Sequence, residues 1–116
     1  MDITIEYRKM CDCPEIQEAW KPRWGDYILE DGMVFVSVSV KAMLEDRAYL
    51  IWLPKQDQLQ DMFTTYSNGE RYRRFDAFIT DFRIWRTLGD YVSLEKLWLM
   101  FVMHEKYHKV WDKEWR

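Results

Sequence analysis

The only two histidines of the chain stand four residues apart, in the segment His104-Glu105-Lys106-Tyr107-His108. On a helix, residues i and i+4 share one face, so both imidazoles could reach a single zinc ion. The glutamate between them could then act as a general base toward a metal-bound water. The segment therefore matches the H-E-x-x-H pattern of zinc-dependent hydrolases.

The surroundings of this motif argue against a catalytic metal centre. A catalytic zinc ion needs a third protein ligand, and only eight residues of this chain follow His108. Asp112 and Glu114 would reach the ion only through a tight reversal. Histidines near a helix C-terminus are also favoured simply by the helix dipole. We therefore expect no metal and no cofactor, and keep a zinc-dependent hydrolase that uses His104, His108 and Glu105 as an alternative function.

A second group with potential chemistry is a set of arginines interleaved with aromatic residues. It comprises Arg71, Arg73, Arg74, Arg83 and Arg86, with Tyr72, Phe75 and Trp85 between them. Such a pattern can bind phosphates and stack on bases, so nucleic-acid binding is a further alternative function. Glu70, Asp76 and Asp81 lie in the same stretch, and pairing at i,i+3 or i,i+4 would neutralise much of the charge. A solvated helix face is the simpler interpretation.

The C-terminal tail carries Trp111 and Trp115 among polar residues. Both could fold back onto the core, or they could form an apolar contact for a partner. The candidate interaction residues are therefore Arg71, Arg73, Arg74, Trp85, Arg86, Trp111 and Trp115. Cys11 and Cys13 stand too close together for good disulfide geometry, and we interpret them as ordinary thiols.

The composition favours one globular domain covering residues 1–116. The chain is 48% hydrophobic and 32% charged, which is typical of a globular protein rather than a disordered one. A net charge of −3 argues weakly against a general nucleic-acid binder. No apolar stretch is long enough to cross a bilayer, and no signal-peptide pattern is present. We expect a cytoplasmic protein with no membrane partner.

Three segments in the first half have the periodicity of strands, at about 26–30, 33–40 and 48–53. Asp31-Gly32 is a strong two-residue hairpin signal between the first two. In the second, valines alternate with other residues, which predicts that the valines face the core and the serines face water. We expect a three-stranded antiparallel meander. Residues 3–9 fit either a helix or a strand, and Pro14 suits the first turn of a helix that ends before Pro22.

The second half is helical in pattern. Apolar residues recur at helical spacing after Leu59, after Phe75 and after Leu94, with Gly69 and Gly89 between the runs. Ser93 could cap the last helix. The sequence therefore predicts an α+β fold, in which an N-terminal helix and three C-terminal helices pack on the sheet.

Residues spread over most of the chain resemble an uncharacterised family of small proteins encoded by phages and prophages of Gram-positive bacteria. The matching residues are Ile51-Trp52-Leu53-Pro54 with Gln56, Gln58, Leu59, Gln60 and Met62; Leu97-Trp98-Leu99, Phe101-Val102-Met103, Glu105-Lys106-Tyr107 and Lys109-Val110-Trp111; and Lys9-Met10-Cys11, Glu15-Ile16-Gln17 and Trp20-Lys21-Pro22. In that family lysine commonly stands at the position of His104, and asparagine or glycine at that of His108. The resemblance thus implies that the histidine motif is particular to this chain.

These observations together favour a non-catalytic accessory protein of a phage or prophage. We expect it to bind a host or phage macromolecule, a protein more readily than a nucleic acid, and interference with a host defence is one form that this binding could take.

Overall fold

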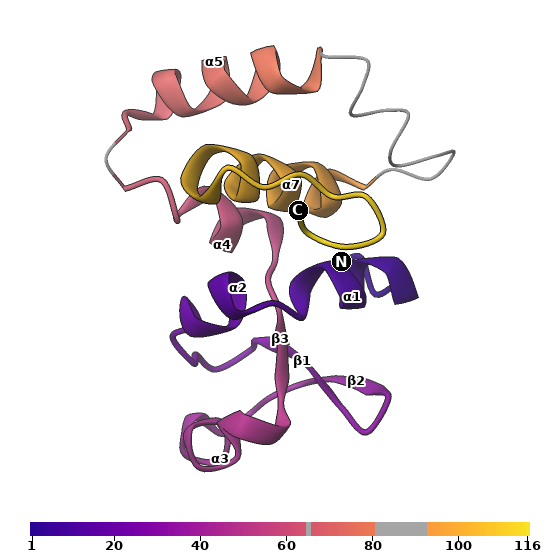
Figure 1. Cartoon of the computed structure of the whole chain (residues 1–116). Helices are drawn as coiled ribbons and strands as arrows, with labels where there is room; N and C mark the ends of the chain where they lie inside the picture. Colours follow the sequence, from indigo (N-terminus) through magenta and orange to yellow (C-terminus); the bar gives the residue numbers. More distant parts are fainter. Residues whose placement is uncertain (65, 81–92) are drawn as a thin grey trace. The chain divides into compact units, whose positions relative to one another are not determined.

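The computed structural model describes residues 1–64, 66–80 and 93–116, which group into two compact units (Figure 1). The first unit contains Met1 and residues 3–55, and the second contains Asp2 and the described residues from 56 to 116. The fold is α+β with one three-stranded antiparallel sheet, as the sequence predicts. The expected single domain stays a prediction.

The first unit holds the sheet and most of the short helices. Its elements are α1 (Ile5–Cys11), α2 (Pro14–Glu18), β1 (Tyr27–Glu30), β2 (Met33–Val36), α3 (Val40–Glu45), the 3₁₀ turn η1 (Arg47–Tyr49) and β3 (Ile51–Leu53). The open choice at residues 3–9 is decided in favour of a helix, because the Thr4 side chain accepts a hydrogen bond from the Tyr7 N–H and caps α1. Pro14 occupies the first turn of α2, as expected.

The sheet has the order β2-β1-β3, with β1 in the centre. Strands β1 and β2 form the predicted hairpin, and both turn residues have positive φ, 51° at Asp31 and 78° at Gly32. The predicted meander is wrong, because β3 pairs with β1 and not with β2. The chain crosses to the other edge of the sheet through α3 and η1, where the sequence suggested only a plain connection and an early start of the strand.

The second predicted strand, 33–40, ends at Val36. Gly25 donates to the Ser37 carbonyl while the Ser37 N–H donates to the Asp26 carbonyl, so two residues oppose one in a β-bulge. Ser39 then caps α3 by accepting from the Ala42 N–H. The prediction that valines face the core is therefore wrong: Val36, Val38 and Val40 are exposed, whereas Ser37 is buried.

The outer edge of β3 is closed by one side chain. The Gln17 amide nitrogen donates to the carbonyls of Trp52 (3.0 Å) and Cys11 (2.9 Å), and its oxygen accepts from the Trp52 N–H at 2.8 Å. The amide thus takes the place of a neighbouring strand at Trp52. The bonds also fix α2 beside β3, because Gln17 lies within α2. The indole rings of Trp20 and Trp52 also stack, with centroids 6.4 Å apart.

The second unit consists of α4 (Gln56–Gln60), α5 (Asn68–Ile79) and α7 (Leu94–Tyr107), and both α4 and α5 contact α7. Ser67 caps α5 and Ser93 caps α7, the latter as predicted. Phe75 of α5 stacks on Trp98 of α7 at 3.8 Å between centroids. The predicted stop at Gly89 lies outside the described residues. Among the helices that are described, none combines the length and the apolar character needed to cross a membrane.

Replacing Gln17 tests the closure of the β3 edge. Gln17→Ala leaves the Trp52 N–H and two carbonyls without their partners, so we expect a loss of roughly 2 kcal/mol in the free energy of unfolding. Urea unfolding followed by circular dichroism measures it. Gln60→Ala, which removes an amide from α4 without any such hydrogen bonds, serves as the matched control. Equal effects of the two substitutions would contradict the proposed role of Gln17.

Candidate functional site

The two histidines of the H-E-x-x-H segment do not share a helical face. His104 lies in the last turn of α7, but the helix ends at Tyr107 and His108 has left-handed backbone angles, φ 57° and ψ 38°. The spacing of four residues places two imidazoles together only while the helix continues. Because the chain turns away at His108, the basis of the sequence pattern is lost at this position.

The described residues provide no third metal ligand grouped with these histidines. Within residues 1–64, 66–80 and 93–116, no three or more His, Cys, Asp or Glu side chains are grouped so that they could hold a metal ion. Asp112 and Glu114, the two carboxylates considered from the sequence, belong to the C-terminal loop. His104 instead lies against the ring of Phe78, at 5.3 Å between centroids, and 3.7 Å from a carboxylate oxygen of Glu105. The expected absence of a cofactor stays a prediction.

The arginines of α5 have acidic partners. Arg73 makes a bidentate pair with Glu70, at 2.9 and 2.6 Å, and Arg74 donates to the same carboxylate at 2.7 Å. These hydrogen bonds lower the pKa of Glu70 from 4.5 to about 2, and the bonds from Arg73 have a larger effect than the bond from Arg74. Arg74 also lies 3.5 Å from Glu105, and Arg71 lies 3.9 Å from Asp61.

The pairing leaves little unbalanced positive charge on this part of α5. The guanidinium of Arg74 further packs over the ring of Tyr66, at 4.7 Å from the centroid. Phosphate binding would have to displace these contacts. Two candidate interaction residues of the same cluster, Trp85 and Arg86, lie outside the described residues, as do Arg83 and Asp81.

The two tail tryptophans contact each other. Trp111 and Trp115 form an antiparallel bridge, and their rings meet edge to face with centroids 5.0 Å apart. Val110 and Arg116 exchange backbone hydrogen bonds, which close the loop between them. Trp111 is buried and Trp115 half-buried. Trp111 is therefore part of the core, and Trp115 packs against its ring; a role of this pair in binding a partner stays a prediction.

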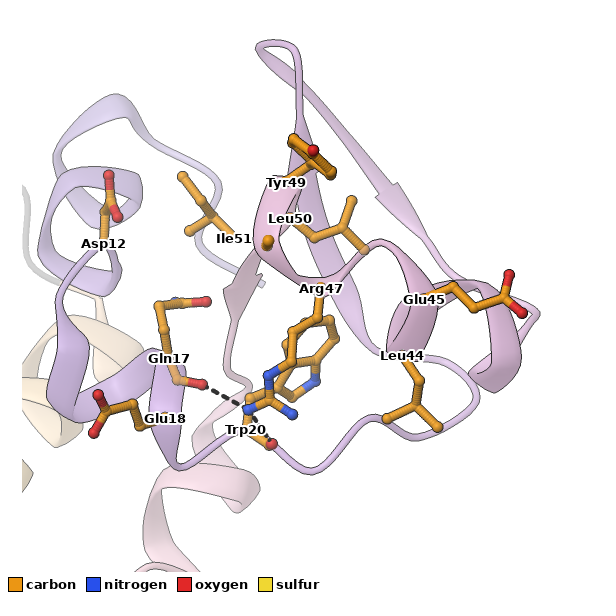
Figure 2. Close-up of a pocket in the computed structure, with 11 residues that line it drawn as sticks. Asp12, Gln17, Glu18, Trp20, Leu44, Glu45, Arg47, Tyr49, Leu50 and Ile51 are labelled. Atoms are coloured by element: carbon orange, nitrogen blue, oxygen red, sulfur yellow. Dashed lines mark hydrogen bonds between the residues drawn. The ribbon is translucent and has the colours of Figure 1, made fainter.

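A groove in the first unit was not anticipated from the sequence (Figure 2). It has a volume of about 880 Å³ and lies between the end of α2 and the segment that runs from α3 through η1 to β3. Apolar groups and carboxylates both line it. The lining residues are Asp12, Gln17, Glu18, Trp20, Leu44, Glu45, Arg47, Ala48, Tyr49, Leu50 and Ile51.

Arg47 forms the centre of this groove and is held there by three contacts. Its guanidinium donates to the carbonyls of Gln17 (2.9 Å) and Trp20 (2.6 Å), as the dashed lines in Figure 2 show. It also lies 5.2 Å above the centroid of the Trp20 ring. The carbonyls at the end of α2 need partners once the helix stops, and a cation is favoured at that end. The guanidinium is therefore directed toward the backbone of the groove.

The rim of the groove is acidic and apolar. Asp12, Glu18 and Glu45 are exposed. Tyr49 of η1 is 80% exposed, and Leu44 of α3 is also exposed. The sequence placed residues 48–53 in a strand, which hid this site. The available signal was Arg47 followed by Tyr49, a cation and a large aromatic residue that the strand pattern left unexplained.

No protein-family model matches the chain, and neither a curated protein nor a solved structure matches it. The functional argument therefore depends on the residues themselves.

The Glu70 carboxyl group gives a pH-dependent prediction. Its folded pKa of about 2 lies below the usual value of 4.5, so its pairing with the arginines stabilises the fold fully above pH 4.5. This contribution falls as the pH drops from 4.5 toward 2. We expect an NMR titration of the Glu70 carboxyl carbon to have its midpoint near 2 and to move toward 4.5 in the double variant Arg73→Ala, Arg74→Ala. If the titration midpoint of Glu70 were the same with and without the two arginines, the described pairing would be contradicted.

The backbone at His108 gives a second prediction. A non-glycine residue in the left-handed region is strained, so His108→Gly should raise the free energy of unfolding by about 1 kcal/mol. The same change at His104, inside α7, should lower it by about 1 kcal/mol because glycine weakens a helix interior. Urea unfolding of both variants measures the contrast. If both variants lose stability equally, His108 does not end the helix in this way.

Proposed function

We propose that the protein is a non-catalytic phage or prophage accessory protein that acts in the host cytoplasm by binding another protein. The partner inserts a segment with basic and apolar side chains into the groove of the first unit. The observation that carries this proposal is the combination of an exposed aromatic and aliphatic wall with three carboxylates around a single, inward-directed guanidinium.

The charges of the groove favour a basic segment. Within the described part of the chain, neither Asp12 nor Glu18 takes part in a salt bridge. Glu45 has Lys41 at 3.8 Å, but both side chains are largely exposed and such a pair contributes little. Arg47 supplies one opposite charge and directs it toward backbone carbonyls. The negative excess attracts lysine or arginine side chains and disfavours acidic ones.

The apolar wall favours a polypeptide over a small ion. Tyr49 and Leu44 present exposed surface of the kind that contributes most to protein–protein contacts when it becomes buried. A long basic side chain can pack its methylene groups on Tyr49 while its charged head reaches the carboxylates. Adjacent apolar side chains of the same segment would cover Leu44. These two features together define a partner segment in which basic and apolar residues alternate.

The biological setting in this proposal comes from the sequence resemblance to small phage and prophage proteins. Such a protein would meet host proteins after infection, and a host defence protein is one class of partner. Nucleic acid is less favoured as a partner because the described arginines of α5 have carboxylate neighbours.

Fluorescence polarisation with three labelled probes tests the proposed binding. The probes are a peptide of alternating leucine and lysine, its leucine–glutamate counterpart, and a single-stranded oligonucleotide of similar size. We expect the lysine peptide alone to bind, with an affinity that falls as the salt concentration rises. Glu18→Lys should weaken binding by about threefold to tenfold, because it reverses a charge at the rim.

A charge reversal outside the groove provides the control. Glu114→Lys changes the net charge equally but lies in the C-terminal loop, so it should leave the affinity unchanged. Tyr49→Ala should weaken binding at every salt concentration, since it removes apolar contact. Equal binding of both peptides would contradict the proposal, and preferential binding of the oligonucleotide would replace it with the nucleic-acid alternative.

A further inference from the structure

The two edges of the sheet differ in how their backbone groups are satisfied. The Gln17 amide hydrogen-bonds both the backbone N–H and the backbone carbonyl of Trp52. These two backbone groups therefore point away from β1. In the pairing register, Trp52 of β3 lies opposite Ile28 of β1, and Ile28 lies opposite Phe35 of β2. In an antiparallel sheet the backbone groups of successive residues point to opposite sides. Ile28 and Phe35 consequently bond each other, and the groups of Val34 and Val36 point to the outer edge of β2.

The same alternation continues past the end of β2. The N–H and carbonyl groups of Ser37 both bond to the β1 side, to Asp26 and Gly25. The backbone groups of Val38 therefore point outward, like those of Val34 and Val36. Three alternate valines thus present a row of donors and acceptors along one edge, without hydrogen-bond partners among the described residues. This edge shares no residue with the groove.

The outer edge of β2 lacks two of the features that usually prevent strand addition. Residues 33–40 contain neither a charged residue nor a proline. Phe35 and Met33 lie on the same face of the sheet as Ile28 and Trp52. Ile28 and Trp52 are only 2% and 4% exposed, whereas Phe35 is 41% and Met33 is 70% exposed. The side chains that pack on this face cover β1 and β3 but leave β2 partly exposed. A strand added beside β2 would extend the sheet and its apolar face.

We propose that this edge pairs with the same edge of a second copy of the chain. In an antiparallel pair centred on Val36, Val36 of one copy lies opposite Val36 of the other, and Val34 lies opposite Val38. Each outward-pointing backbone N–H or carbonyl of one copy then meets an outward-pointing backbone group of the other. In this antiparallel arrangement, the end of the uncharged run that follows the Asp31 turn lies beside the end that leads into α3 and Lys41 of the other copy. This self-complementarity is what a two-fold symmetric interface requires. The pairing joins both three-stranded sheets into one.

Sedimentation of the full chain over a range of micromolar concentrations tests this dimer. The expected result is a concentration-dependent shift toward twice the 14.4 kDa of one chain. Val36→Pro removes an outward N–H that β1 does not use, and should weaken dimerisation by about tenfold or more because the lost bond occurs on both copies. Val36→Thr keeps the N–H and the branched shape, so it should still dimerise. Circular dichroism confirms that each variant is folded.

A cysteine at the two-fold axis tests the register independently of stability. In the proposed pair the two copies of residue 36 lie opposite each other, at a Cα separation of about 5.5 Å that suits a disulfide. Val36→Cys should therefore form a disulfide-linked dimer on mild oxidation, whereas Leu44→Cys, an exposed position on α3, should not. The native cysteines are buried and give the background.

A chain that stays monomeric at every concentration would overturn the proposal, as would a dimer whose affinity Val36→Pro leaves unchanged. Equal cross-linking of both cysteine variants would also overturn it. None of these outcomes bears on peptide binding in the groove, which is measured with separate probes and separate variants.

Discussion

A strand at the edge of a small sheet has backbone donors and acceptors that must find partners, and this requirement organises the first unit. At β3 the partner is the amide of Gln17, which supplies both a donor and an acceptor to Trp52. That contact fixes α2 against the sheet. Once α2 is fixed, its terminal carbonyls become reachable for Arg47, and the space between α2 and η1 becomes the groove. The groove is thus a consequence of how one edge of the sheet is closed.

The other edge of the sheet has no equivalent side chain among the described residues of the first unit. Its valines carry outward backbone groups, and its neighbouring apolar side chains are only partly covered. The two edges therefore suit different partners. The closed edge carries charged and aromatic side chains that can distinguish one segment from another, while the open edge offers mainly backbone hydrogen bonds and shape, which an identical strand can satisfy.

Several residues that suggested chemistry have structural roles in the second unit. Arg73 and Arg74 share Glu70 and link α5 internally, and Arg74 reaches Glu105 on α7. Trp111 and Trp115 contact each other. His108 ends α7. The arginine and tryptophan side chains have nearby partners, whereas His108 acts through its backbone conformation. Charge pairing, aromatic packing and a helix end are the structural roles of residues whose linear pattern resembled a phosphate site, a docking tail and a metal site.

The sequence by itself determined the α+β class, and also the Asp31-Gly32 hairpin and the Ser93 cap of α7. The hairpin and the cap depend only on residues close together in the chain. The sequence did not determine the strand order or the face on which the valines lie. A period of two is the same for either face of a sheet, and the hairpin register puts Phe35, not the valines, on the face of the buried Ile28. The groove depended on the tertiary structure still more. Gln17 and Trp52, or Trp20 and Arg47, are far apart along the chain, and only folding brings an amide to a strand edge or a guanidinium to a helix end.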